Sequence, residues 1–164
     1  MLLEDSLRAV PLLAGLGDPV VDVGSGGGAP GIPLALALPG REFVLLESQR
    51  RKCDFLGRWA PPNARVVCGR AEEQGTDWAG VAVAKALAPP PAAAEWCLPL
   101  VRPGGAVVLF VGRTADLAAV SRVAGLVGGG QPEEHDGLLL IPKVTATPSG
   151  FPRRPGIARK RPLA

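Results

Sequence analysis

The residues best suited to chemistry form a glycine-rich turn near the start of the chain. The run DVGSGGGAPG, residues 22–31, begins inside a short apolar segment, Val20–Val23. Glycines in such a turn let the backbone bend tightly and let a ligand approach without meeting a Cβ atom. A helix that starts after the turn offers free N–H groups and a positive dipole end to a carboxylate or phosphate. The turn therefore predicts a ligand site that includes four of its residues, Gly24, Ser25, Gly26 and Gly28.

An acidic residue at a characteristic distance narrows the class of ligand. Glu47 ends a second apolar segment, and Ser48 follows it. An acid about 20 residues beyond such glycines commonly accepts hydrogen bonds from ribose hydroxyls. The alternative is a flexible loop with a surface glutamate, but the strand, turn and helix that the motif demands are all present. We therefore expect a ribose-bearing cofactor to contact Glu47 and Ser48.

Asp22 discriminates between two such cofactors. The spacing of Gly24, Gly26 and Ala29 also fits the dinucleotide pattern, so a nicotinamide-dependent oxidoreductase stays open as an alternative. A carboxylate directly before the glycines would repel a bound pyrophosphate, but it would attract the positive amino group of S-adenosylmethionine. No residue set for hydride chemistry accompanies the turn. The sequence thus favours S-adenosylmethionine and a methyltransferase.

Apolar strands alternate with helical segments along the chain. The predicted strands are 20–23, 43–46, 64–68, 81–84, 106–111 and 138–144, and the predicted helices are 32–38, 49–60, 91–101 and one capped by Thr114. Most of the strands are uniformly apolar, which requires cover on both faces and is typical of parallel sheets. This order predicts an α/β fold with a doubly wound, mostly parallel sheet and helices on both faces.

Three local features make this expectation more specific. Ser48 is a suitable N-cap for the helix 49–60, and Trp59 falls on the predicted buried face of that helix. Pro142 lacks an N–H group, so the last strand is expected near an edge of the sheet. Residues 128–134 lack an apolar run, so we expect the sheet to be short or frayed there.

Length and composition set the remaining limits. The 164 residues fit one domain, with a cofactor-binding part over 1–150 and a tail over 151–164. Three cysteines, Cys53, Cys68 and Cys97, show neither a disulfide framework nor a zinc pattern, so we expect three reduced core residues, no metal and a cytoplasmic protein. No apolar run reaches the roughly 18 residues of a membrane span, and we expect no membrane contact and a monomer.

The positive charge is concentrated in the tail. The whole chain carries +3, and the tail alone carries +5 and no acid, which leaves −2 for residues 1–150. Five side chains supply this charge: Arg153, Arg154, Arg159, Lys160 and Arg161. Such a cluster favours contact with a polyanion. Aromatic residues make up only 4% of the chain, which argues against an RNA platform built on base stacking.

Several motifs, in order, resemble one known family. They are EDSL at 4–7, DVGSGGGAPGIPL at 22–34, LLES at 45–48, GRAEE at 69–73, AKALAP at 84–89, PGG at 103–105, TP at 147–148, FPRRPG at 151–156 and KRPL at 160–163. Together they resemble the bacterial small-subunit rRNA guanine-N7 methyltransferases, also called the glucose-inhibited division protein B family. The resemblance covers nearly the whole chain, and its ending is the most distinctive part.

The resemblance implies a fold, a reaction and a set of partners. The fold would be that of class I S-adenosylmethionine-dependent methyltransferases, and the reaction would be methylation of guanine N7 in 16S rRNA of the 30S subunit. It places Arg70, Ala71 and Glu72 near the adenine, although a helix start with acids in its first turn is the alternative reading. The five basic residues of the tail would contact rRNA phosphates, unless they form only a solubilising end.

Methyl transfer to guanine N7 needs orientation more than proton transfer. N7 has a free lone pair and no proton to lose, so the enzyme must chiefly hold sulfur, methyl and N7 in line. Lys85, after the fourth strand, is the candidate residue to face the cofactor crevice and grip guanine O6, and a solvated loop lysine is the alternative. Lys lacks the bidentate fork of Arg, so base positioning is expected to be weaker.

The chain also departs from the family pattern. Leu2 stands where the family has a His, Lys85 where an Arg is usual, and Val111 where a Lys is usual. The family also carries a helical segment before the point at which this chain begins. These departures motivate a second hypothesis, a non-catalytic RNA- or ribosome-binding remnant of the family.

Overall fold

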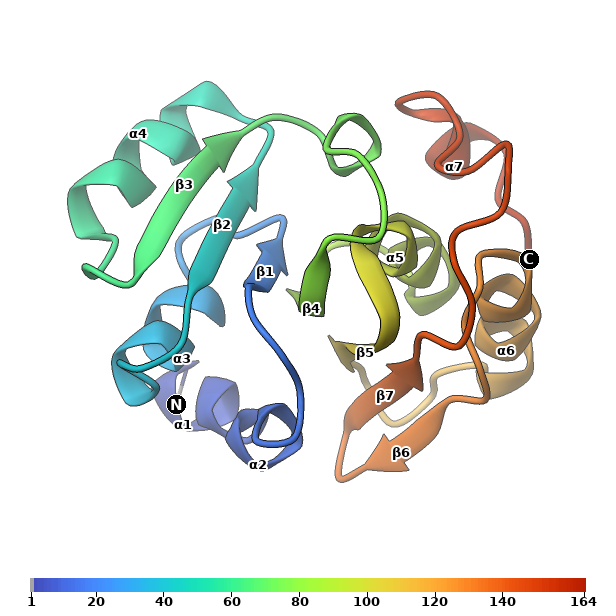
Figure 1. Cartoon of the computed structure of the whole chain (residues 1–164), viewed down its shortest axis with the longest axis horizontal. Helices are drawn as coiled ribbons and strands as arrows, with labels where there is room; N and C mark the ends of the chain where they lie inside the picture. The colour runs from blue at the N-terminus through green and yellow to red at the C-terminus, as the bar shows by residue number, and fades with distance from the viewer. Residues whose placement is uncertain (1) are drawn as a thin grey trace.

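A seven-stranded sheet with helices on both faces organises the protein (Figure 1). The computed structural model describes residues 2–164; Met1 and the side chain of Leu2, which stands where the family has a His, lie outside the description. The strand order is β3-β2-β1-β4-β5-β7-β6. The strands are β1 Val20–Val23, β2 Phe43–Glu47, β3 Ala64–Cys68, β4 Ala79–Lys85, β5 Val101–Phe110, β6 Glu133–His135 and β7 Leu138–Pro142.

Short helices connect and cover these strands. The α-helices are α1 Leu2–Leu7, α2 Val10–Leu13, α3 Gly31–Ala37, α4 Arg50–Trp59, α5 Pro90–Cys97, α6 Leu117–Leu126 and α7 Ile157–Lys160. Two 3-10 turns, η1 Ala71–Glu73 and η2 Leu98–Leu100, complete the described elements. Within residues 2–164, no helix has both the length and the apolar composition that crossing a membrane requires.

The first five strands of the sheet are parallel, as predicted. β1 pairs in parallel with β2 and β4, with Val21 opposite Val44 on one side and Ala82 on the other. β2 also pairs in parallel with β3, and β4 pairs in parallel with β5. β7 runs antiparallel between β5 and β6. The α/β class and the mostly parallel sheet are therefore confirmed.

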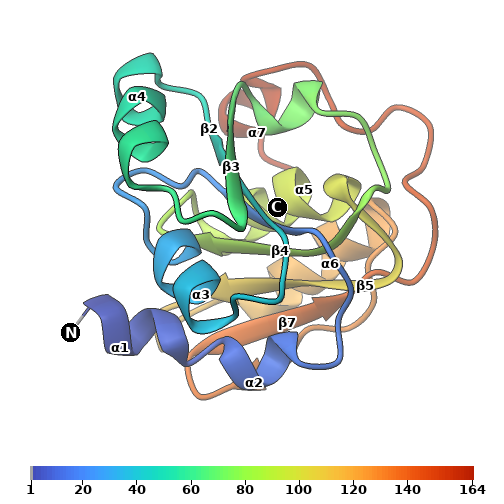
Figure 2. The same cartoon turned by 60° about the vertical axis from the view of Figure 1, so that its left-hand side comes forward.

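Two apolar cores explain why the central strands are uniformly apolar. Val21 and Val23 of β1 pack in the core that includes α5 and α6. Val20 packs in a second core with α2 and α3 (Figure 2). Because successive side chains of a strand point to opposite faces, a strand between two helical layers needs apolar residues on both faces. In β1 only Asp22 is polar.

The antiparallel edge shows how Pro142 is accommodated. β6 is only three exposed residues long, and it pairs with β7 no further than Leu140. Pro142 pairs with Ala106 of β5 and lies beyond this stretch of the β6 ladder. A Pro is tolerated there because β6 does not extend far enough to need the N–H that Pro lacks.

Several element boundaries and caps differ from the sequence expectations. Gln49, not Ser48, is the N-cap of α4, and Ser48 makes no capping hydrogen bond. Asp116, not Thr114, caps α6, where its carboxylate accepts from the N–H of Ala119 at 3.0 Å. The helix expected over 91–101 ends at Cys97, and β5 begins five residues before its predicted start.

Trp59 is also not where the helical pattern placed it. Its side chain is 65% exposed and packs beside Phe55, with ring centroids 6.4 Å apart. Only Cys53 and Leu56 of α4 are buried. β3, on which α4 packs, is an edge strand of the sheet, so the last turn of α4 has no further strand beneath it.

The buried Lys143 connects the end of β7 to the start of β5, its antiparallel neighbour. The side chain of Lys143 is 0% exposed, and burial lowers its pKa while the neighbouring carboxylate of Asp77 opposes that change. Its ammonium donates to Asp77 at 2.8 Å, to Thr147 at 2.9 Å, and to the carbonyls of Leu98 and Val101 at 2.7 Å each. Lys143 therefore fixes the end of β7, the start of β5 and the chain leading to the tail.

Replacing Lys143 by Ala is expected to be strongly destabilising. The change removes the cationic partner of the Asp77 carboxylate and the ammonium donor of two buried carbonyls, which costs about 3–5 kcal/mol of unfolding free energy. Urea unfolding measures this loss. The exposed Lys160→Ala serves as the matched control and should stay within about 0.5 kcal/mol of the wild type. Equal stability of the two variants would contradict the role of Lys143.

Candidate cofactor site

A cavity of about 430 Å³ lies where β1, β2 and β4 end at one edge of the sheet. Its volume is within the range of ligand sites, roughly 300–1,000 Å³. The carboxyl ends of parallel strands are the usual place for such sites. The cavity brings together six of the residues predicted from sequence: Gly24, Glu47, Ser48, Arg70, Ala71 and Glu72.

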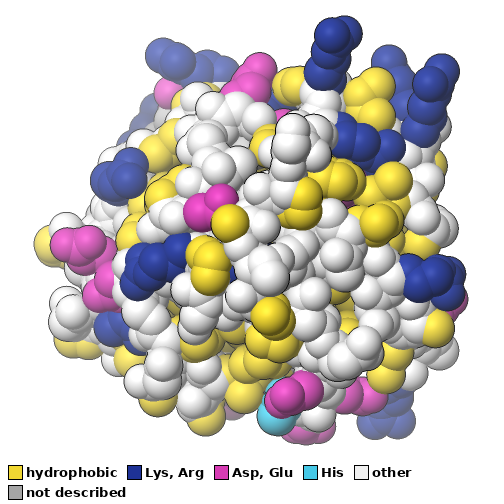
Figure 3. Space-filling view, turned by 45° about the vertical axis from the view of Figure 1, so that its right-hand side comes forward, with side chains coloured by type: hydrophobic (Ala, Val, Ile, Leu, Met, Phe, Trp, Pro, Cys, Tyr) yellow, Lys and Arg dark blue, Asp and Glu magenta, His cyan; other side chains and the backbone are white. Residues whose placement is uncertain are grey.

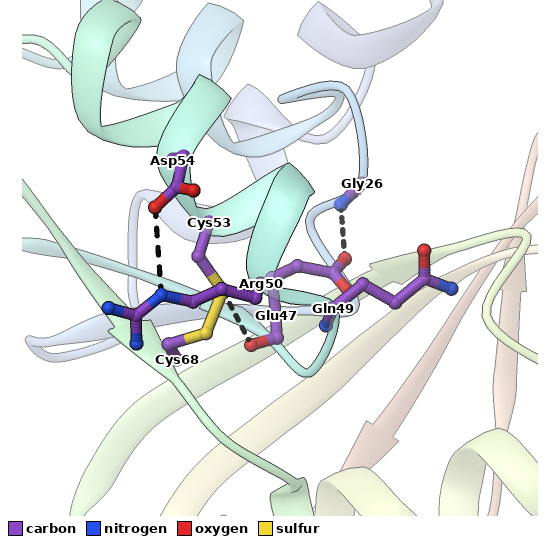
Figure 4. Close-up of a disulfide and its surroundings, with 7 residues drawn as sticks. All are labelled: Gly26, Glu47, Gln49, Arg50, Cys53, Asp54 and Cys68. Carbon is purple, nitrogen blue, oxygen red and sulfur yellow. Dashed lines mark hydrogen bonds and ion pairs between the residues drawn. A yellow bond between two sulfur atoms is a disulfide. The ribbon is translucent and has the colours of Figure 1, made fainter.

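The Glu47 carboxylate holds the parts of this site together (Figure 4). The residue is only 5% exposed, and its two oxygens accept from the backbone N–H groups of Gly26 at 2.8 Å and Gln49 at 2.9 Å. One carboxylate therefore joins the end of β2, the glycine turn and the start of α4. Each carboxylate oxygen has a second lone pair, which is available for a ribose hydroxyl.

The glycine turn is fixed by further backbone contacts. The N–H groups of Gly24 and Ser25 both donate to the Leu46 carbonyl, at 2.8 and 3.1 Å. The Ser25 hydroxyl donates to the Asp22 carbonyl at 3.0 Å. Gly28 has φ +100°, a conformation that L side chains rarely adopt. Gly24 lines the cavity, whereas the other predicted turn residues, Ser25, Gly26 and Gly28, shape the turn behind it.

Asp22 lies beneath the turn and is fully buried. One carboxylate oxygen accepts from the Gly31 N–H at 3.0 Å, and the other has no partner among the described residues. Burial raises the pKa of Asp22 to about 7. Gly31 must be glycine, because a Cβ there would collide with the Asp22 carboxylate. The unpaired oxygen suits a cationic donor, but its contact with a cofactor amino group stays a prediction.

Comparison with known proteins identifies the family. A family model described as rRNA small subunit methyltransferase G matches residues 1–122. The Ribosomal RNA small subunit methyltransferase G of Synechococcus sp. (strain JA-3-3Ab) is 37% identical over 98% of this chain and 72% of its own length. That of Pelotomaculum thermopropionicum is also 37% identical, over 96% of this chain and 74% of its own length.

The chain belongs to the rRNA small subunit methyltransferase G family. Solved structures support the fold that membership implies. The antibiotic-resistance methyltransferase Kmr is 22% identical with a TM-score of 0.59, covering 84% of this chain and 93% of its own. A T. thermophilus 16S rRNA N2 methyltransferase, solved with AdoMet and guanosine, is 18% identical with a TM-score of 0.64, covering 89% and 40%. These likenesses show the fold alone.

In this family member, Lys85 lies outside the cavity wall. Its ammonium forms an ion pair with Asp5 of α1 and lies 5.6 Å from the centre of the Phe110 ring. α1 packs against α3, which brings Asp5 to the end of β4. Ala86 and Leu87, which follow Lys85, line the cavity in its place. The role of Lys85 in holding the cofactor or guanine stays a prediction.

The basic tail divides into residues with different surroundings. Arg153 donates to both oxygens of the buried Glu95, at 2.6 and 2.7 Å, and this ion pair raises the pKa of Arg153. Arg153 therefore anchors the tail, and its contact with an rRNA phosphate stays a prediction. Figure 3 shows Lys and Arg side chains along the upper edge of the molecule, at the height of α7 in Figure 1. Four basic residues of the tail are exposed, Arg154, Arg159, Lys160 and Arg161, and Arg159 also lines the cavity.

Nine residues of the cavity wall were not predicted as cofactor contacts. They are Val23, Leu46, Gln49, Lys52, Gly69, Ala86, Leu87, Trp96 and Arg159. Gln49 and Lys52 lie two and five residues after Glu47, so their place in the wall could have been predicted from the turn that follows this strand. Trp96 and Arg159 come from α5 and α7, and no local motif connects those helices to the turn. Among the described residues, no group of three or more His, Cys, Asp or Glu side chains is arranged to hold a metal.

The expectation of three reduced cysteines is wrong. Cys53 and Cys68 form a disulfide between α4 and the end of β3, and only Cys97 is a free, buried thiol among the described residues. The connection from α4 back to β3 brings the buried face of the helix over the carboxyl end of the strand, with the two Cα atoms 5.8 Å apart. The disulfide lies beside Glu47 (Figure 4). Gly69, directly after Cys68, donates its N–H to the Glu47 carbonyl at 2.9 Å.

The disulfide is expected to stabilise the protein measurably. It closes a loop with a sequence separation of 15, and a loop of that size contributes about 3 kcal/mol. Cys68→Ser and treatment of the wild type with dithiothreitol should each lower the unfolding free energy by a similar amount. Dithiothreitol should leave Cys68→Ser unchanged, which controls for other effects of the reductant. A wild type that is insensitive to reduction would rule this contribution out.

The raised pKa of Asp22 predicts a specific pH dependence of stability. The unfolded carboxyl releases its proton near pH 4, whereas the folded one keeps it until about pH 7. The unfolded state therefore binds fewer protons in this window, and the contribution of Asp22 to stability falls as pH rises from 4 to 7. Asp22→Asn, which keeps an acceptor for Gly31, should lack this fall. Denaturant unfolding across this window tests it, and parallel curves for the two proteins would contradict it.

Proposed function

We propose that this chain uses S-adenosylmethionine to methylate guanine N7 in 16S rRNA of the small ribosomal subunit. Two observations support the proposal. The chain belongs to the rRNA small subunit methyltransferase G family, and its cavity gathers the glycine turn, Glu47 and the segment Arg70–Glu72 at one edge of the sheet. The gathering of these residues around Glu47 is the observation that carries the cofactor assignment.

The residues of the site fit the parts of S-adenosylmethionine. The free lone pairs of Glu47 match the ribose hydroxyls, and Ala71 and Glu72 form the wall expected for the adenine. The unpaired oxygen of Asp22 suits a positive amino group, because a buried carboxylate gains from a cationic partner. When bound, the cofactor supplies an electrophilic methyl group on a sulfonium. The protein's contribution is to hold that methyl in line with its acceptor.

The guanine acceptor must be held in one orientation, but its methylation needs no strong general base. Guanine N7 carries no proton, so the residues around it need only orient the ring and exclude competing nucleophiles. Lys85 is the donor proposed for guanine O6. Its ion pair with Asp5 and its place beside Phe110 hold the ammonium at the end of β4, next to the strand end that borders the cavity. Asp5 is thereby a positioning residue for Lys85.

The exposed part of the tail is the proposed contact with rRNA. Arg154, Lys160 and Arg161 are exposed, and the Arg153–Glu95 ion pair anchors the segment that carries them. Phosphate contacts of this kind weaken steeply as salt rises. With the 30S subunit as partner, we place the protein in the cytoplasm.

Calorimetric titration with S-adenosylmethionine tests the cofactor assignment. We expect the wild type to bind, and Glu47→Gln to bind at least about tenfold more weakly, because the amide lacks the charge and one acceptor. Glu73→Gln, a change at an exposed residue of η1 outside the cavity wall, is the matched control and should bind like the wild type.

Two outcomes would contradict the proposal. A folded wild type that binds NADH and not S-adenosylmethionine would point to the oxidoreductase alternative. Cofactor binding together with salt-sensitive rRNA binding, but without methyl transfer to 30S subunits, would identify a non-catalytic member of the family.

A further inference from the structure

The cofactor cavity has a wall that comes from the far end of the chain. Arg159 of α7 lines the cavity together with Glu47, Ala71 and Glu72. Figures 1 and 2 both show α7 beside η1, the turn that carries Ala71 and Glu72. The C-terminal segment is thus part of the site as well as a surface tail.

Three contacts fix α7 in this place. The N–H of Gly156, directly before the helix, donates to the Glu72 carboxylate at 3.3 Å. Arg153 is tied by two hydrogen bonds to Glu95 of α5, which is only 3% exposed. Ala158, next to Arg159, is buried where α7 packs on α5. A segment held at these points keeps Arg159 at the cavity, and no ligand is needed to place it there.

The surroundings of Arg159 indicate which end of a ligand it meets. The glycine turn and the start of α3, which suit a carboxylate, follow β1. The segment that leads into α7 is instead bonded to Glu72, on the adenine side. A guanidinium beside the positive sulfonium would be repelled. Its planar group stacks well on an aromatic face, so an adenine ring is the matching partner. Trp96 lines the same cavity and supplies further flat surface.

We propose that Arg159 is a cofactor-binding residue that covers the nucleoside end of the S-adenosylmethionine site. This inference rests on the proposed function. It assigns Arg159 to the cofactor, whereas the sequence grouped it with the rRNA-binding residues of the tail. Its neighbours Lys160 and Arg161 do not line the cavity and keep that role.

The test compares two arginines of the same segment. Arg159→Ala and Arg154→Ala remove the same side chain, but Arg154 does not line the cavity. Calorimetry with S-adenosylmethionine and with 5′-methylthioadenosine, which lacks the amino-acid part, should show about fivefold weaker binding of both ligands by Arg159→Ala. Arg154→Ala should bind both ligands as tightly as the wild type. Thermal unfolding without ligand should be the same for both variants.

The possible results separate this inference from the proposed function. Wild-type affinity in Arg159→Ala, or a loss confined to S-adenosylmethionine, would overturn the inference and leave the cofactor assignment intact. No binding of either ligand by the wild type would overturn the proposed function itself. If Arg159→Ala loosens α7, Arg159→Lys keeps the charge and the stem, and it should still lose about twofold for both ligands because it lacks the planar group.

Discussion

The site depends on one buried carboxylate whose two oxygens hold separate pieces of backbone. Glu47 ends β2 and accepts N–H groups from the glycine turn and from the start of α4. Burying this charge costs free energy, which the two charge-assisted hydrogen bonds offset. The β2 end, the turn and α4 therefore keep one geometry. The disulfide between Cys53 and Cys68 reinforces it one strand away, where Gly69 bonds to the Glu47 carbonyl.

The pattern of apolar residues was sufficient to predict most of the fold. Uniformly apolar strands such as 43–46 occur where helices cover both faces, and the two cores confirm this. The errors lie where topology overrides local pattern. Trp59 is exposed because β3 happens to be an edge strand, which its own helix cannot reveal. Gln49 replaces Ser48 as the N-cap of α4, where its N–H donates to the Glu47 carboxylate, a contact that the local helix pattern does not reveal.

The residues of the candidate site also separate into those that the sequence could predict and those that it could not. Residues of the turn and of the strand ends were predictable, because their spacing reports the strand-turn-helix unit directly. Arg159, Trp96 and the disulfide depend on how distant elements pack, and no short motif contains that information. Lys143 is a further example: four acceptors from separate segments converge on it, yet nothing in its own sequence context distinguishes it from a surface lysine.

The central claim is that this chain places a methyl group on guanine N7 of small-subunit rRNA. Methylation at N7 makes the base positively charged, so that borohydride reduction followed by aniline cleaves the RNA at that nucleotide. The decisive measurement is this cleavage on 16S rRNA from unmodified 30S subunits, after incubation with the chain and S-adenosylmethionine. The account predicts a new cleavage at a guanine that appears only when both are present. Intact 16S rRNA after incubation with a folded, cofactor-binding chain would contradict it.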